Sequence, residues 1–132
     1  MAVIGNTLTI FSHLKRIYIE RGAGTMKAEK PELLDRIAAY IEKNYANHIT
    51  VDALARHFYV SSSTISHLFK QKMGVSLYRY ITQRRLIAAK SLIAQRVPME
   101  EISLRVGFVD YSTFYRAFKQ EFGISPRRFS QL

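Results

Sequence analysis

The sequence predicts an all-α protein in which two similar pairs of helices are joined by one long central helix. Two observations lead to this fold class. Residues 69–74 read FKQKMG and residues 118–123 read FKQEFG, so four of six positions match at an offset of 49. Between these copies, residues 78–96 (YRYITQRRLIAAKSLIAQR) contain no glycine or proline and are rich in helix-forming residues. We therefore expect a repeated helical unit with a helical connection.

The repeat extends beyond these six residues. At the offset of 49, Ser61 aligns with Asp110, whereas upstream the offset becomes 48 and Leu54 aligns with Ile102. One residue is therefore inserted in the second copy, just before its matched helix.

The first copy, at about residues 50–74, is expected to form two helices around a tight turn. Thr50 is a candidate N-cap for the segment VDALARHF, and Ser61 is a candidate N-cap for the helix that follows. Gly74 is well placed to end that second helix. The apolar positions that recur at helical spacing, and should face the core, are Val51, Leu54, Ala55, Phe58, Ile65, Leu68 and Phe69.

The central helix is expected over residues 78–96. Its apolar side is formed by Ile81, Leu86, Ala89 and Ile93. A helix of about 20 residues spans roughly 30 Å.

The second copy, at about residues 98–123, repeats the pattern of the first. Pro98 suits a first helical position, Gly107 is expected to make the turn, and Asp110 should cap the next helix. A last short helix should begin at Ser125-Pro126. The residues expected to be buried in this copy are Ile102, Val106, Phe114, Ala117 and Phe118, and the second helix should stop at Gly123.

The charge of the chain is strongly basic. Twenty Lys and Arg stand against ten acidic residues, giving a net charge of +10 and a pI near 10.1. No acidic residue occurs between Asp52 and Glu100. A basic segment of this length attracts polyanions, although a solvated basic surface is the ordinary alternative.

The composition also excludes several kinds of site. The chain has no cysteine, so disulfides, thiolate zinc sites and cysteine nucleophiles are excluded, and a reducing cytosol is a fitting environment. The four histidines show no metal-ligand spacing, and no phosphate-binding glycine loop is present. No apolar run approaches the roughly 20 residues that a membrane span requires. We therefore expect no cofactor, metal or membrane.

Each predicted helix pair has the helix-turn-helix pattern, which is a short helix, a turn of about four residues and a second helix with a polar outer face. An ordinary helical bundle can contain one such hairpin. Two copies with matching caps and stop glycines in a basic chain favour double-stranded DNA as the partner. Because one turn of B-DNA is about 34 Å, the central helix has a suitable length to place two recognition helices in successive major grooves.

Five segments in fixed order carry a resemblance to a known family: ITVDALA, VSSSTISHLFKQKMGVSLYRYI, RRLIAAKSLI, EISLRVGF and YSTFYRAFKQEFGISPRRF. Residues 30–132 resemble the C-terminal DNA-binding domain of AraC/XylS-type bacterial transcription regulators. The resemblance implies about seven helices in two homeodomain-like helix-turn-helix subdomains joined by a central helix. Two departures are Ser103, where the family favours alanine, and Phe129-Ser130, where Tyr-Arg is common. The second departure bears on a terminal phosphate contact.

The resemblance also implies a function. It indicates a sequence-specific transcription regulator, not an enzyme, that acts in the bacterial cytoplasm on the nucleoid. RNA polymerase is an expected partner, because activation is commoner than repression in the family. A small-molecule effector is expected only if an upstream sensing domain exists. The alternatives are a non-specific DNA-packaging protein, which needs no two distinct polar faces, and a DNA-repair enzyme, which would lack its usual cysteine acceptor.

The first 26 residues stand apart from this domain. An amphipathic helix is expected over residues 7–20, followed by a flexible linker at Gly22-Ala23-Gly24. By resemblance, this segment is the tail of an upstream sensing and dimerisation domain, or the remnant of one in a short family member. The helix could pack on its own domain, but we expect a weak homodimer through residues 7–20.

Base-reading side chains should lie on the polar face of each second helix, toward the N-terminal end that enters the groove. Arg116 is the strongest candidate, because a guanidinium can donate two hydrogen bonds to guanine. Tyr111 and Tyr115 could contact a thymine methyl group or a sugar, or pack on the helix surface. The positions that the resemblance assigns to base contacts are Ser63, Ser66, His67, Tyr111, Ser112, Tyr115 and Arg116.

Five basic residues are candidates for phosphate contacts. Four of them are Lys70, Lys119, Arg127 and Arg128. Arg85 is the fifth, although it could instead bridge helices inside the domain.

Overall fold

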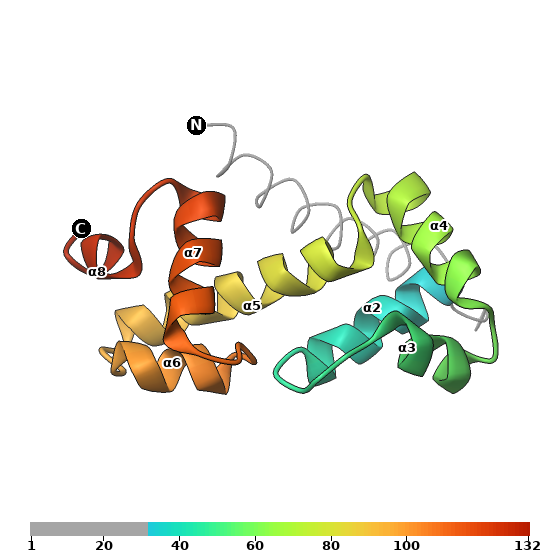
Figure 1. The fold of residues 1–132 in the computed structure, drawn as a ribbon, viewed down its shortest axis with the longest axis horizontal. Helices are drawn as coiled ribbons and strands as arrows, with labels where there is room; N and C mark the ends of the chain where they lie inside the picture. Colours follow the sequence, from blue (N-terminus) through green and yellow to red (C-terminus); the bar gives the residue numbers. More distant parts are fainter. Residues whose placement is uncertain (1–31) are drawn as a thin grey trace, which may run out of the picture.

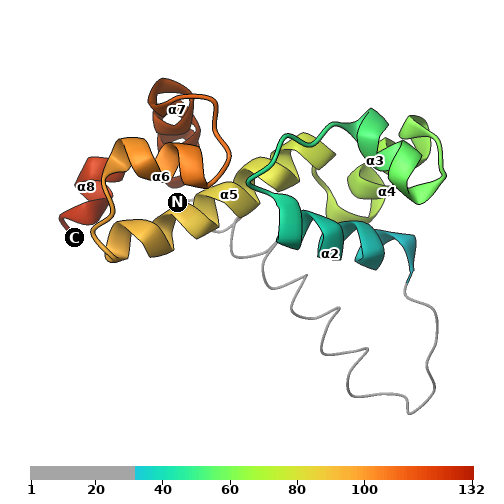
Figure 2. The same ribbon diagram turned by 90° about the horizontal axis from the view of Figure 1, so that it is seen from below.

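A computed structural model describes residues 32–132, which form seven helices and contain no strand. Figure 1 shows how these helices are arranged. The prediction of an all-α fold with about seven helices is confirmed. In Figures 1 and 2, α5 runs through the middle of the molecule, with α2 to α4 at one end and α6 to α8 at the other. The helices are α2 (Leu33–Asn44), α3 (Val51–Phe58), α4 (Ser62–Met73), α5 (Leu77–Ala94), α6 (Met99–Arg105), α7 (Tyr111–Phe122) and α8 (Pro126–Ser130).

Side-chain caps begin most of these helices. Each capping oxygen accepts a hydrogen bond from the backbone N–H three residues later, which satisfies a donor that the first helical turn leaves open. The predicted caps Thr50, Ser61, Asp110 and Ser125 are confirmed, with distances of 3.1, 3.0, 2.8 and 3.2 Å. Ser76 caps α5 in the same way at 3.1 Å.

Helix ends follow the predicted glycines. Gly74 and Gly123 adopt φ angles of 74° and 79° and end α4 and α7. Such left-handed conformations strain residues that have a Cβ atom, so glycine is the favoured residue there.

Two predicted boundaries are wrong by one or two residues. Pro98 is not the first residue of α6 but the residue before it, because its ψ of 142° is extended and its carbonyl already accepts the Ile102 N–H at 2.9 Å. The central helix covers Leu77–Ala94 rather than 78–96. It ends early because Arg96 has a left-handed φ of 64°.

The molecule has two separate hydrophobic cores, and α5 contributes to both. Its first half supplies Leu77, Tyr80 and Ile81 to the N-terminal core, and its second half supplies Leu86, Ala89 and Ile93 to the C-terminal core. The predicted inward positions are buried, apart from Val51, Phe58, Leu68 and Ala117, which pack at the edges and are half-buried. Each helix-turn-helix unit therefore has its own core on a shared spine.

The N-terminal predictions lie outside the described residues. The helix expected over residues 7–20, the linker that follows it and the homodimer assigned to that helix all belong to residues 1–31. Among residues 32–132, no helix is long and apolar enough to cross a membrane.

Candidate nucleic-acid interface

The helices α4 and α7 are the second helices of the two units and are called the recognition helices below. Each packs against the short helix before it, α3 and α6 respectively. In the first unit, the Ser62 hydroxyl donates a hydrogen bond of 2.6 Å to an Asp52 carboxylate oxygen, which ties the start of α4 to the start of α3. This contact fixes the end of α4 that the helix-turn-helix geometry would direct into a groove.

The first recognition helix presents a polar outer face. Ile65 and Phe69 are fully buried on its inner side. Because residues three and four apart share a face, the predicted base-contact residues fall together on the opposite side. Ser63, Ser66 and His67 are all exposed there.

The second recognition helix presents a different outer face. Ser112 and Arg116 are exposed, whereas Tyr111 and Tyr115 are half-buried. The two tyrosine rings lie 6.1 Å apart, and Tyr111 also lies 6.1 Å from the ring of Phe114, as measured between centroids. The tyrosines therefore pack on the helix surface while part of each ring stays accessible.

Asp110 caps the N-terminus of α7, and the contacts of this cap favour its charged form. Hydrogen bonds from the backbone and side chain of Thr113 lower the pKa of Asp110, and the charge of Arg116 lowers it further. The cap is therefore an anion at neutral pH, which suits the positive end of the helix dipole.

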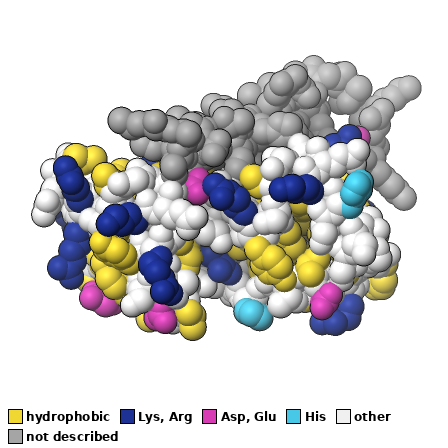
Figure 3. Space-filling view, turned by 45° about the horizontal axis from the view of Figure 1, so that its top comes forward, with side chains coloured by type: hydrophobic (Ala, Val, Ile, Leu, Met, Phe, Trp, Pro, Cys, Tyr) yellow, Lys and Arg dark blue, Asp and Glu magenta, His cyan; other side chains and the backbone are white. Residues whose placement is uncertain are grey.

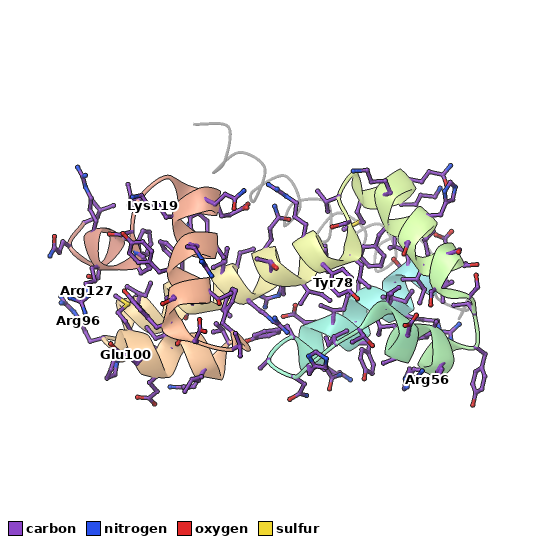
Figure 4. The ribbon with its side chains drawn as sticks, in the orientation of Figure 1. Arg56, Tyr78, Arg96, Glu100, Lys119 and Arg127 are labelled. Atoms are coloured by element: carbon purple, nitrogen blue, oxygen red, sulfur yellow. The ribbon has the colours of Figure 1, made fainter. Side chains whose placement is uncertain are left out.

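Four of the five phosphate candidates are available to a ligand. Lys70, Lys119, Arg127 and Arg128 are exposed. Figure 3 shows Lys and Arg side chains spread over both ends of one face of the molecule. Figure 4 places Lys119 on α7 and Arg127 at the outer end of the C-terminal unit, near the start of α6.

Arg85 has internal partners. Its Nε donates to the Tyr45 carbonyl at 2.6 Å, and a terminal nitrogen donates to the Asn47 carbonyl at 2.9 Å. Burial lowers the pKa of its guanidinium. These contacts support the alternative role of Arg85 as a bridge between α5 and the α2–α3 loop.

Tyr78 is a candidate that the sequence reasoning missed. Its side chain is 53% exposed, and its hydroxyl oxygen accepts the Val51 N–H at 3.2 Å, which leaves the hydroxyl proton to donate outward. The signal was present in the sequence: at the offset of 49, SLYRY (76–80) aligns with SPRRF (125–129), so Tyr78 matches Arg127. Figure 4 shows Tyr78 on the side of α5 that faces α2, and its bond to Val51 reaches the start of α3.

No metal site is found within residues 32–132, because no group of three or more His, Asp or Glu side chains there is arranged to hold one. His57 instead packs between aromatic rings, with centroids 4.7 Å from Tyr40 and 4.8 Å from Phe58. Ser103, the departure noted above, is 1% exposed, and its hydroxyl donates to the Glu100 carbonyl at 2.7 Å.

Sequence comparison identifies a family and several relatives. Residues 54–131 match the model of a family described as a helix-turn-helix domain. The chain is 31% identical over 121 residues to the arabinose operon regulatory protein of Salmonella typhimurium, which covers 88% of this chain and 43% of that protein. It is 33% identical over 99 residues to the HTH-type transcriptional activator RhaS of Escherichia coli, with 74% and 36% covered. The chain thus spans less than half the length of these relatives.

Solved structures share the fold. An AraC-type DNA-binding domain-containing regulator from Chromobacterium violaceum superposes with a TM-score of 0.67 at 27% identity, covering 71% of this chain and 85% of that chain. The DNA-binding domain of AdpA, solved in complex with a target DNA, gives a TM-score of 0.72 over 76% of this chain and 92% of that chain. Its identity is 20%, so this likeness concerns the fold alone.

Proposed function

This chain belongs to the AraC-type family of helix-turn-helix DNA-binding transcription regulators, and on that premise we propose that it binds duplex DNA as a monomer, with α4 and α7 in successive major grooves. The family is one of DNA-binding domains, not of enzymes. The observation that carries the proposal is the position of the two recognition helices at opposite ends of one continuous helix, α5 (Figures 1 and 2).

The length of α5 supports this arrangement. Its 18 residues span about 27 Å at 1.5 Å per residue. Both recognition helices contact α5, so its length limits the spacing between them, and that length is of the order of the roughly 34 Å of one DNA turn. Two non-equivalent recognition helices in one chain remove the need for a second subunit to reach the second groove.

The side chains divide into two roles. Arg116 is the expected reader of guanine, since its guanidinium is exposed on the outer face of α7. The hydroxyl groups on α4 accept and donate, so they position the helix more than they discriminate between bases. The residues expected to contact phosphates are Lys70, Lys119, Arg127 and Arg128, to which we add Tyr78.

We further propose that the bound protein activates transcription by contacting RNA polymerase. The relative RhaS is named a transcriptional activator, and the aligned part of this chain covers 36% of it. A reporter gene placed behind the bound site should rise in expression when the protein is present. A fall in expression would indicate a repressor.

The DNA-binding proposal is tested by selecting sites from a random duplex pool and footprinting them. We expect two protected patches, about one helical turn apart, on the same face of the duplex. Scrambling one patch should abolish protection there and weaken the other. A single patch of half the length would contradict two-groove binding, and equal affinity for scrambled DNA would indicate a non-specific packaging protein.

A further inference from the structure

The two copies of the repeat differ at one charged position. In FKQKMG the fourth residue is Lys72, and in FKQEFG it is Glu121. Lys72 is exposed, whereas Glu121 is only 5% exposed. A buried carboxylate on a recognition helix is costly unless it is paired, so its partners indicate its role.

Two partners of Glu121 lie on the central helix. Nε2 of Gln83 donates to one carboxylate oxygen at 2.9 Å, and Gln83 is itself 1% exposed. A terminal nitrogen of Arg79 lies 3.6 Å from the other carboxylate oxygen. Because Arg79 is 45% exposed, this ion pair is weak, and of these two contacts the buried hydrogen bond to Gln83 constrains Glu121 more strongly.

This hydrogen bond is made at the boundary between the two cores. Gln83 follows Ile81, which belongs to the N-terminal core, and precedes Leu86, which belongs to the C-terminal core. The other buried residues of α7, Phe114, Phe118 and Phe122, all pack in the C-terminal core. Glu121 is therefore the buried residue of α7 that reaches toward the half of α5 on which the first unit is built.

Further contacts lie near the same boundary. Glu42 of α2 pairs with Arg84 of α5 through two hydrogen bonds. A Cβ atom on Gly107, in the turn of the second unit, would lie 2.8 Å from Arg85 Nε and 2.9 Å from the Tyr45 carbonyl oxygen. The α2–α3 loop therefore lies against the turn of the second unit, and Tyr45 in this region packs against both cores.

We infer that Glu121 is a positioning residue, which holds the second recognition helix at a fixed orientation to the first through Gln83 and so sets the half-site spacing that the protein accepts. The spacing part of this inference rests on the proposed function. The orientation part does not, because it concerns the free protein.

Two variants distinguish the effect of the Gln83–Glu121 hydrogen bond from the effect of side-chain packing at the same place. The double variant Gln83→Met/Glu121→Met keeps side chains of similar length and removes the bond, and apolar replacement of a buried polar pair is often neutral for stability. The conservative variant Glu121→Gln keeps an acceptor for Gln83, and its amide can donate to Gln83 Oε1, which has no hydrogen-bond partner. Glu100→Gln, on the exposed first turn of α6, is the control for the lost negative charge.

The first measurement is a distance between spin labels in the absence of DNA. The sequence has no cysteine, so labels can be placed at Gln71→Cys and Gln120→Cys, which are matched exposed positions of the two recognition helices. We expect one narrow distance distribution for the parent chain, Glu121→Gln and Glu100→Gln. The double Met variant should give a broadened or shifted distribution while its thermal unfolding stays cooperative. An unchanged distribution would overturn the inference.

The second measurement uses selected DNA with native half-site spacing and with one base pair added or removed. The parent chain should discriminate strongly between these spacings. The double Met variant should lose about fivefold or more in affinity for the native spacing and discriminate less, whereas both Gln variants should behave like the parent. Equal losses at all spacings, with an unchanged label distance, would overturn the role in spacing.

If the chain does not bind two half-sites, the DNA measurements would give a different result from those above. The parent chain itself would then bind all spacings alike or protect one patch only, which would also remove the role of Glu121 in spacing. The label distances would still decide whether Glu121 orients α7.

Discussion

The two helix-turn-helix units are built alike but present different chemistry. The same cap positions and stop glycines produce both, yet matched positions on the outer faces carry His67 and Ser66 in one unit and Arg116 and Tyr115 in the other. Hydroxyl groups contact any base or phosphate, whereas a guanidinium selects guanine. We therefore expect the second unit to discriminate between sequences and the first to contribute mainly affinity and register.

The turns of the two units also differ in what surrounds them. Tyr59 and Gly107 occupy matched positions and both have positive φ angles, of 57° and 106°. Tyr59 is 94% exposed, whereas Gly107 lies against the Tyr45–Ala46 backbone of the first unit. The same turn is therefore an open surface in one unit and a contact between units in the other.

The largest effect is expected at this contact. Gly107→Ala should destabilise the protein by roughly 2–4 kcal/mol, because the new methyl group meets backbone atoms in a strained conformation. Gly123→Ala is the matched control, since its φ is also positive but no atom lies within 4 Å of the added Cβ. It should cost about 1–2 kcal/mol. Urea unfolding followed by circular dichroism measures both, and equal costs would show that close approach is unimportant.

The next effect concerns base reading. Arg116→Ala should weaken specific binding by roughly 1–3 kcal/mol and relax the preference at one base position. His67→Ala, the matched change in the first unit, should cost less and leave the selected sequence unchanged. Titrations on the selected site and on single-base variants of it test this asymmetry. If both changes relax sequence preference equally, the two units read DNA in the same way.

A smaller effect on DNA binding is expected at the lysines that occupy matched positions in the two units. Lys70→Ala and Lys119→Ala should each weaken binding to specific and scrambled DNA by similar factors, because phosphate contacts carry no sequence information. Each should reduce the slope of log affinity against log salt by about 0.9. Binding measured at several salt concentrations gives these slopes. A loss confined to the specific site would place that lysine on a base.

The smallest expected effect is a difference between the matched N-caps Asp110 and Ser61 in how stability depends on pH. The pKa of Asp110 is lowered in the folded protein, so its stabilisation is fully present above the ordinary Asp value of about 3.9 and is lost as the pH falls through the lower folded value. Ser61, the matched cap, does not titrate. Asp110→Asn should therefore flatten the stability curve below about pH 4, while Ser61→Asn should not change its shape. Unfolding curves from pH 2 to 5 check this, and identical curves for Asp110→Asn and the parent chain would contradict it.

Much of the local structure was predictable because its causes lie within a few residues. A Ser, Thr or Asp side chain caps the N–H three positions later, and helical spacing places Ile65, Phe69, Phe114 and Phe118 on inner faces. Pro98 shows the limit of this reasoning, because a proline fits both the first helical position and the position before it. Only the backbone around it decides between the two.

The candidate site was predicted less completely. Exposure of Ser63, Ser66, His67, Ser112 and Arg116 follows from the helical period once the buried face is known. Tyr78 was missed because its relation to Val51 crosses 27 positions of chain, although the extended repeat aligned it with Arg127. The role of Arg85 stayed open because a half-buried arginine and a phosphate-binding arginine look alike in sequence.

The two capped helix-turn-helix units on a shared helix follow from the sequence alone, because caps, stop glycines and the apolar period act over at most a few turns. How the two units meet depends instead on contacts between segments that are far apart in the chain. Glu121 and Gln83 are 38 positions apart, and Arg85 and Tyr45 are 40 positions apart. No local pattern marks such pairs, because a buried carboxylate is recognised only when the donor that satisfies it has been brought alongside by the fold.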